Sequence, residues 1–475
     1  MPSETPVLEE CERPETASTT ERTSYRRRLR RYQVSFCILA LCYLVQVATP
    51  LRLHPDTIVL LSMADSFAHG GGLLFHGQPT VFPPGYPALA ALLLKLGLAH
   101  NWVLIGFNMV SLAVGLWAAA YILRRRLYDT IFPVSVVCLV SLFSFVFIKY
   151  STIPLTESGF FALAMCALAA MDSASQPRCG RTFWLRIVAG WILTLAALTV
   201  RRVGLALIPA LLWSIFSHKG VRAYVRRLSG SMKVAILLGM GCASAVTAWV
   251  VMETSTLRDR QSVMSSLPDV ISRTLIGRFR ELSEIALNVP FSALSPTMRL
   301  AALLVGGLLL ALVLAGVIVA GREIHATTVF FCTYCLIIFS WPYYDPRFWL
   351  PVIPLLAAYA GLAIQHAIAR HRFWGGCLRL YLAVFMLIGA MTLAWSTAIT
   401  FSGRRFPDTY QRPKPGAAAS LSAMDRVAQH IMPEGYYLWG EERSFRSTYC
   451  AIFRSCTDAP AQVDESALHV YRTFR

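Results

Sequence analysis

Eleven runs of apolar residues, most of them close to 20 residues long, limit what this chain can fold into. An α-helix needs about 20 apolar residues to cross the ~30 Å hydrocarbon core of a bilayer. The composition agrees, since 56% of the 475 residues are hydrophobic and 15% are charged, against about 45–50% and about 25% in soluble domains. The sequence therefore predicts an all-α polytopic membrane protein. The expected spans are 33–50, 102–123, 130–149, 155–171, 183–200, 203–217, 233–252, 300–320, 326–341, 348–368 and 378–398.

The net charge of +18 comes from basic residues that cluster in short loops, as they do in cytoplasmic loops of membrane proteins. No basic stripe with interleaved aromatic residues lies clear of the bilayer, so nucleic acid is not an expected partner. The shorter run 84–98 decides the orientation. If it is a re-entrant or interfacial helix, the basic loops near 124–126, 178–186, 219–227 and 370–379 all face the cytoplasm. If it crosses, all of them face outward against the positive-inside bias. We therefore expect about eleven full spans and an extracytoplasmic C-terminus.

Three parts of the chain follow from this topology. Residues 1–32 are polar, end in an arginine cluster before the first span, and are expected to be a disordered cytoplasmic N-terminus. Residues 33–398 form the transmembrane domain, with loops 51–101 and 253–299 on the non-cytoplasmic face, called the outer face below. Residues 399–475 predict a small extracytoplasmic α/β appendage, because a helical stretch is followed there by a turn and a strand-like run.

The cysteines give one hint about the compartment. Most of the twelve fall in apolar spans, where cysteine behaves as a small hydrophobic residue. Cys450 and Cys456 instead lie in the polar tail. They could pair if that tail is outside the cytoplasm, where disulfides persist.

The first outer loop brings a carboxylate to the membrane surface. Asp56 follows His54 and precedes an expected amphipathic helix over 57–69, and a Pro-Pro-Gly-Tyr-Pro segment with Tyr86 then leads into the re-entrant run. Asp56 has two interpretations. It could cap the helix, since Asp is a favoured N-cap residue, or it could carry function, since an ionisable residue at the edge of a span is costly.

Other charged residues gather in very short turns on the same face. Each arginine could simply extend to lipid head groups. Together, cations on the face that should lack them indicate an anion site, because the guanidinium fork suits phosphate oxygens. The candidates are Lys149, Glu157, Arg201, Arg202, Tyr344, Asp345 and Arg347.

These features resemble the GT-C glycosyltransferases, in the branch of the protein O-mannosyltransferases, the lipid A aminoarabinose transferase and the RgtA/B/C/D-like bacterial enzymes. The resemblance rests on the Asp-bearing first outer loop with its PPGYP segment, on Pro154 to Ser158, on LTVRRVGLALIPAL at 198–211 and on DPRFWLPVIPLLAAYAG at 345–361. Two departures stand out. The chain has Arg201-Arg202 where an Arg-Pro pair is common in the family. Its first loop has a single Asp in HPD rather than an acidic pair, unless Asp65 serves.

The resemblance implies an inverting sugar transfer from a polyprenyl- or dolichyl-phosphate donor to a glycan, lipid or protein acceptor. Asp56 would then be the general base, and Glu157 a second carboxylate near the acceptor. The donor phosphate would bind Arg201 and Arg347, with Arg202 and Lys149 as alternates. His54, Tyr86, Tyr344 and Asp345 would contact substrate. The membrane would be a bacterial-type plasma (inner) membrane in a cell envelope, or the endoplasmic reticulum in a eukaryote.

Cofactor and rival functions stay open at this point. No nucleotide-binding motif is present. Some relatives use a divalent metal ion, which remains a candidate cofactor, but the loop histidines match no zinc pattern, so no metal ligand is assigned. The main alternative is a transporter or flippase of lipid-linked saccharides. Such proteins usually carry internal repeats and ionisable residues at mid-bilayer, neither of which is evident here.

Overall fold

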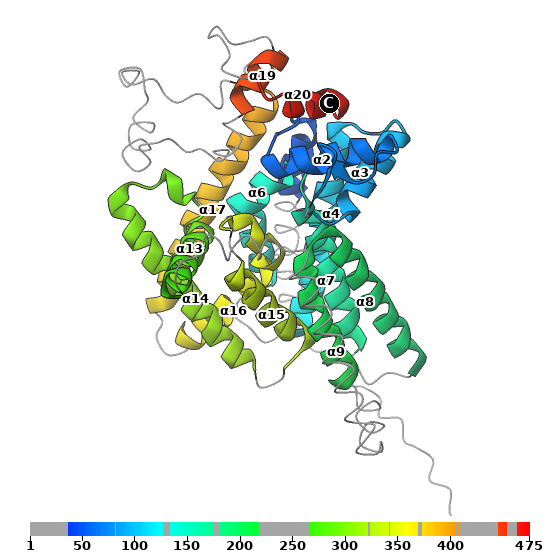
Figure 1. The fold of residues 1–475 in the computed structure, drawn as a ribbon. Coiled ribbons are helices and arrows are strands. Elements are labelled where there is room, and N and C mark those ends of the chain that lie inside the picture. Colours follow the sequence, from blue (N-terminus) through cyan, green and yellow to red (C-terminus); the bar gives the residue numbers. More distant parts are fainter. Residues whose placement is uncertain are drawn as a thin grey trace, which may run out of the picture.

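A computed structural model shows how the chain is arranged (Figure 1). The structure describes residues 37–80, 82–126, 134–174, 180–217, 267–321, 324–341, 343–368, 373–403, 406–407, 445–453 and 463–475. Helices account for nearly all regular structure in these residues. The described strands form one hairpin of two short antiparallel strands, β1 (Leu74–Phe75) and β2 (Gln78–Pro79). The all-α prediction therefore holds for the described part of the chain.

A helix lies at each predicted span within the described residues. The long helices are α4 (Asn101–Arg126), α7 (Thr156–Ala174), α8 (Gly180–Val200), α14 (Pro296–Ala320) and α17 (Phe373–Thr400). Shorter or interrupted ones are Cys37–Ala48, α5 (Val134–Leu142) with α6 (Phe145–Ser151), η2 (Arg202–Ala206) with α9 (Leu207–Ser217), α15 (Ala326–Ser340), and η4 (Pro346–Val352) with α16 (Ile353–Ile368).

Among the described residues, five helices are long and apolar enough to cross a membrane, and the pair α5 and α6, bent by 56°, would make a sixth. The full count of eleven spans stays a prediction, and the expected span 233–252 lies outside the described residues. The ambiguous run 84–98 forms α3 (Gly85–Lys95). Its 11 residues rise about 16 Å at 1.5 Å per residue, which is too short to cross the bilayer.

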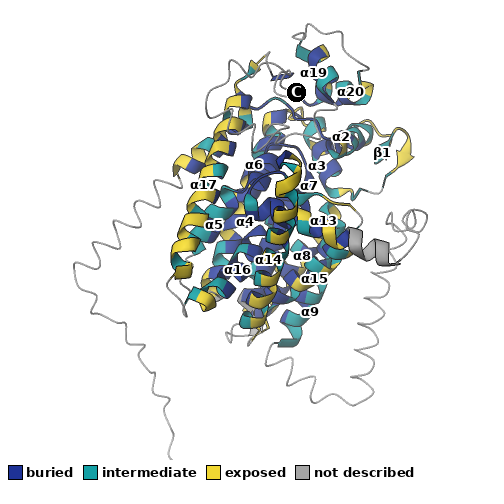
Figure 2. Cartoon of the chain, turned by 90° about the vertical axis from the view of Figure 1, so that its left-hand side faces the viewer, coloured by how far each residue is buried: buried dark blue, intermediate teal, exposed yellow. Residues whose placement is uncertain are grey.

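The burial pattern is that of a bundle surrounded by lipid. The η4–α16 segment is 78% buried and forms the centre, whereas α14 and α17 are each 22% buried. Exposed residues of α17 form a continuous stripe in Figure 2. Large apolar side chains make up such outward faces, among them Leu304, Leu308, Leu387 and Trp395. A soluble protein would not expose so much contiguous apolar surface, so these faces suit the hydrocarbon core.

Short elements cover one end of the bundle, called the α2 end below. They are α2 (Pro55–Ala68), α3, the β-hairpin, α19 (Arg446–Phe453) and α20 (Glu465–Thr473), which lie together at the top of Figure 1. The first loop and the C-terminal residues bind each other there. His469 Nε2 lies 3.0 Å from Asp65 Oδ2, and the Leu53 N–H donates to the Tyr449 hydroxyl at 2.5 Å.

Two tail predictions have partial outcomes. The helical and strand-like stretches expected near 417–439 lie outside the described residues, so the α/β character of the appendage is untested. Cys450 forms a disulfide, while its expected partner Cys456 lies outside the described residues, and the side of the membrane on which the tail lies stays a prediction.

Candidate active site

Four segments distant in sequence bring five charged side chains together beneath the α2 end. Arg347 is the centre of this group: its Nη2 lies 2.5 Å from Asp56 Oδ2, and its Nε lies 2.9 Å from Asp345 Oδ2 and 3.6 Å from Glu157 Oε1. Glu157 in turn lies 2.5 Å from Arg201 Nη1. The sequence placed all five on one face, and the structure joins them into one network, called the charge cluster below.

Asp56 is available to Arg347 because another residue caps its helix. Helix α2 begins with Pro55, and the Asp56 N–H donates to the His54 ring Nδ1 at 3.2 Å. His54 is therefore the N-cap, and the interpretation of Asp56 as the N-cap is wrong. Its carboxylate sits in the first helical turn, where the helix dipole stabilises negative charge, and extends to Arg347.

Glu157 lies in the first turn of α7 and is almost fully buried, with 2% of its side chain exposed. A buried carboxylate of this kind is stable only when paired, and two arginines face it. Arg201 stands at the break between α8 and η2, in extended backbone. Arg201 and Arg347 also share one aromatic ring, since their guanidinium carbons lie 5.4 and 5.3 Å from the Phe348 ring centroid. The two cations are thereby held close to each other.

Asp345 fixes the turn that carries Arg347. Its Oδ1 accepts the Arg347 N–H at 2.9 Å and thus caps η4, and it also accepts a hydrogen bond from the Tyr150 hydroxyl at 2.8 Å. Lys149, the neighbour of Tyr150 on α6, is buried with its ammonium 4.8 Å from the Tyr150 ring centroid. Lys149 therefore reaches the edge of the charge cluster through Tyr150.

The remaining predicted residues have other surroundings. Arg202 is half-buried at the start of η2. Tyr344 lies over the Arg278 guanidinium, 5.1 Å from ring centroid to guanidinium carbon, and stays 40% exposed. Asp65 contacts His69 and His469 near the C-terminal helix α20 rather than the arginines, so it does not complete an acidic pair with Asp56.

Two residues of α13 (Leu267–Leu287) that the sequence analysis missed contact the backbone of the turn around Asp345. Arg278 and Glu281 are both fully or almost fully buried, and Arg278 Nη1 donates to Glu281 Oε1 and Oε2 at 2.7 and 2.6 Å. Glu281 accepts the Asp345 N–H at 2.6 Å. The available signal was an Arg and a Glu three residues apart on a helix, a spacing that places both on one face.

The electrostatics keep Asp56 ionised. Burial alone would raise its pKa, but the charges of Arg347 and His54, the hydrogen bond from Arg347 and the charge of Arg201 together hold the pKa below the ordinary value. Asp56 is also the most accessible of the three carboxylates, with 28% of its side chain exposed against 12% for Asp345 and 2% for Glu157. Of the three, it is the carboxylate most open to the surroundings.

An apolar groove of ≈250 Å³ adjoins the charge cluster. Its lining includes Val200, the neighbour of Arg201 in sequence, Gly159, two residues after Glu157, and Val110 and Val114 on the exposed face of α4. Tyr86 also lines it; among the described residues its buried hydroxyl has no hydrogen-bond partner, and it lies near enough to Glu157 to interact with its charge. The groove thus lies between a lipid-facing surface and residues that neighbour the charge cluster.

Glycine makes this corner possible. The N-terminus of α3 packs so closely on the end of α8 that a Cβ on Gly85 would lie 2.7 Å from the Thr199 carbonyl oxygen. Any larger residue would push Tyr86 away from Val200 and Arg201.

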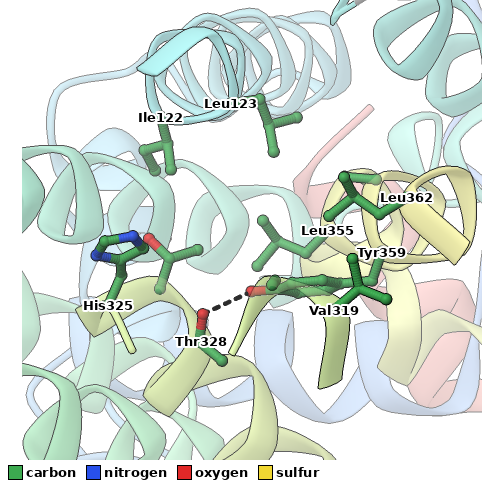
Figure 3. A pocket seen from close by; sticks show the side chains of 11 residues that line it. Ile122, Leu123, Val319, His325, Thr328, Leu355, Tyr359 and Leu362 are labelled. Carbon is green, nitrogen blue, oxygen red and sulfur yellow. Dashed lines mark hydrogen bonds between the residues drawn. The ribbon is translucent and has the colours of Figure 1, made fainter. Parts of the chain in front are cut away.

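A second cavity of ≈220 Å³ lies deeper in the bundle, between the far ends of α4 and α14 and the helices α15 and α16 (Figure 3). Its walls are mainly apolar, and the Thr328 and Tyr359 hydroxyls bond to each other at 3.0 Å. None of the charge cluster lines it.

A metal ion does not fit the charge cluster. In the described part of the chain, no group of three or more His, Cys, Asp or Glu is arranged to hold one. Asp56 and Glu157 each face an arginine at 2.5 Å, which occupies the position that a cation would take.

Comparisons with known proteins find no matching family model and no matching curated protein. Solved structures similar to this chain include ArnT from Cupriavidus metallidurans bound to undecaprenyl phosphate, with 15% identity, 89% of this chain and 88% of that chain covered, and a TM-score of 0.45. An oligosaccharyltransferase from Archaeoglobus fulgidus, in complex with Zn and sulfate, is similar with 11% identity, 85% and 58% coverage and a TM-score of 0.42.

Proposed function

We propose that this protein is a GT-C-type membrane glycosyltransferase that moves a sugar from a polyprenyl-phosphate or dolichyl-phosphate donor to an acceptor hydroxyl on the non-cytoplasmic face, with inversion. The observation that carries the proposal is the charge cluster, in which two arginines and three carboxylates meet, with an apolar groove beside it that is lined by Val200 and Tyr86. A donor with a lipid tail and a phosphate needs both features side by side.

In this proposal the acceptor oxygen attacks the anomeric carbon while the bond from that carbon to the phosphate oxygen breaks. The departing phosphate keeps the bonding electrons, and the acceptor proton passes to Asp56, the most accessible carboxylate of the cluster. Negative charge grows on the phosphate oxygen in the transition state, so fixed guanidinium groups accelerate the step. Arg201 and Arg347 take this role, and Glu157 orients both of them.

The donor phosphate changes the state of the base. Without it, Arg347 binds Asp56 and depresses its pKa, which makes Asp56 a weak base. When a phosphate shares the guanidinium of Arg347, its charge offsets that of the arginine, so the pKa of Asp56 rises. Base strength is thereby coupled to donor binding.

The orientation of the site has one independent support. Cys450 of α19 is disulfide-bonded and lies at the α2 end of the bundle. Disulfides persist outside the cytoplasm, and the positive-inside bias of the sequence places the same end outside.

The direct test uses the protein in nanodiscs with radiolabelled polyprenyl-phosphate mannose, arabinose and glucose in parallel, with membrane extract as acceptor source. We expect release of polyprenyl phosphate from one donor and none in Asp56→Asn. Asp65→Asn is the matched control, because Asp65 lies on the same helix but pairs with His69 and His469. Equal release in Asp56→Asn and wild type would refute the base assignment. No release from any of the three donors, together with transbilayer movement of a lipid-linked saccharide, would favour the flippase alternative.

A further inference from the structure

Helix α13 of the second loop supports the turn that carries Asp345 and Arg347 of the charge cluster. The helix itself contributes no residue to the cluster. The described residues from Trp341 to Trp349, called the turn below, comprise the connection between α15 and η4 and the first residues of η4. Arg278 Nη2 donates to the carbonyls of Trp341 and Tyr343 at 2.6 and 3.0 Å. Glu281 accepts the Asp345 N–H at 2.6 Å and the Trp349 indole N–H at 2.8 Å. One buried ion pair thus binds both ends of the turn.

We propose that Glu281, held by Arg278, is a positioning residue for the transfer reaction, and that its ionised carboxylate keeps Asp345 and Arg347 in register with Asp56 and Glu157. The proposal rests on the proposed function for its activity readout, but the geometry that it describes is independent of any substrate.

The hydrogen-bond pattern requires the ionised form. Both Glu281 oxygens receive hydrogen bonds: Oε1 from Arg278 and the Asp345 amide, and Oε2 from Arg278 and the Trp349 indole. Every partner is a donor, so a protonated carboxyl would direct its own O–H at another donor and lose a bond. An ionised carboxylate is an acceptor only and satisfies all of them.

The position of Asp345 makes this bond matter for the cluster. Its backbone N–H binds Glu281, while its side chain caps η4, accepts the Tyr150 hydroxyl and pairs with Arg347 Nε at 2.9 Å. A shift of this one residue moves Arg347, which contacts both Asp56 and Glu157. Small misplacements of this kind are costly in catalysis.

Burial makes the ionised state sensitive to pH. Burial raises the pKa of Glu281 to about 7, against the opposing effects of Arg278, Trp349 and the Asp345 amide. The charged and titratable groups that interact with it are Arg278 of α13, Asp345 of the turn and Tyr334 of α15. Glu284 lies one turn further along α13. We therefore expect the fall of kcat/KM on the acid side of its pH profile, called the acid limb below, to follow protonation of Glu281.

The test compares Glu281→Gln with Glu284→Gln. Glu284 is the matched control: it lies on the same helix, burial likewise raises its pKa to about 7, and it pairs with Arg280 and the Phe291 backbone. Its charge interacts with that of Asp345, but no hydrogen bond joins it to the turn among the described residues. We expect Glu281→Gln to lower kcat/KM about tenfold or more, the loss expected for one hydrogen bond to a charged group, and to remove the acid limb. Glu284→Gln should keep both. Glu281→Asp, which keeps the charge on a shorter arm, should restore the acid limb and part of the rate.

A second readout needs no substrate. Hydrogen exchange of the Asp345 amide should be faster in Glu281→Gln by about tenfold, as for one lost hydrogen bond, and should quicken in the wild type, relative to intrinsic exchange, as pH falls through about 7. It should not change in Glu284→Gln. Unchanged exchange and an unchanged acid limb in a folded Glu281→Gln would overturn the positioning role. Faster Asp345 amide exchange in Glu281→Gln, found together with a wild type that transfers no sugar, would refute the proposed function and leave the positioning role standing.

Discussion

Arg347 Nη2 and Asp56 Oδ2 lie 2.5 Å apart although 291 residues separate them in sequence. This pair joins the turn of η4 to the first helix of the α2 end. In this arrangement each masks the other: the arginine holds a carboxylate, and the carboxylate is a weaker base than an unpaired one. Affinity and turnover should therefore respond in opposite directions when the pair is broken.

Asp56→Asn should bind polyprenyl phosphate more tightly while it loses transfer. The neutral amide no longer competes for Arg347, and releasing one partly exposed ion pair is worth about 1 kcal/mol, or about fivefold in Kd. Titration of polyprenyl phosphate into nanodisc-embedded protein would measure this. Asp65→Asn should leave the Kd unchanged. Weaker binding in Asp56→Asn would contradict the exchange of Arg347 between carboxylate and phosphate.

Arg347→Lys should keep the charge and lose most of the rate. Arg347 contacts Asp56, Asp345 and Glu157 with different edges of its guanidinium, which a single ammonium cannot reproduce. We expect kcat/KM to fall about 100-fold or more, the loss seen for one transition-state donor. Initial rates at several donor concentrations would measure it. A rate for Arg347→Lys within about threefold of wild type would mean that positive charge alone suffices at position 347.

Thermal stability should fall as pH rises towards 7. Burial raises the pKa values of Glu281 and Glu284 to about 7, so the folded protein holds protons that the unfolded chain releases above its ordinary value. Linkage then lowers the stability of the fold as pH rises from the ordinary glutamate pKa of 4.5 to about 7, and these two groups cause no further loss above that. Melting curves at about pH 6 and pH 8 should show the higher Tm at the lower pH. Glu284→Gln should reduce the difference, and an identical difference in the variant would contradict the assignment.

The sequence predicted the helices, the members of the charge cluster and the short α3 because these depend on local patterns: apolar run length, charge at span ends, and loop charge. It did not predict which carboxylate pairs with which arginine. His54 rather than Asp56 caps α2, and Asp56 instead pairs with Arg347, which lies far away in sequence. The role of Glu281 was missed for a similar reason: it binds the Asp345 backbone N–H and the Trp349 indole, 64 and 68 residues on, and a backbone N–H leaves no mark in a sequence.

Cys450 should resist alkylation in intact cells until a reductant is added. It is disulfide-bonded, whereas Cys37, Cys332 and Cys377 are exposed free thiols on helices. Mass spectrometry after labelling with a membrane-impermeant maleimide, with and without prior reduction, would locate the α2 end on the outer face. Labelling of Cys450 only after the membrane is opened would place that end in the cytoplasm and reverse the proposed topology.

Gly306→Ala should destabilise the protein and impair transfer, while Gly307→Ala should do neither. A Cβ on Gly306 would run into the Phe279 carbonyl of α13, whereas a Cβ on Gly307 would meet the Phe279 ring at an ordinary 3.8 Å. Small residues let membrane helices approach closely, and here the approach fixes α13, which carries Arg278 and Glu281. In an uncrowded helix, Gly→Ala gains about 0.5–1 kcal/mol, so Gly307→Ala should melt at or above the wild-type Tm. Gly306→Ala should lose about 1–3 kcal/mol through overpacking and show faster exchange at the Asp345 amide. Equal Tm values for the two variants would mean that α13 and α14 are not held this tightly together.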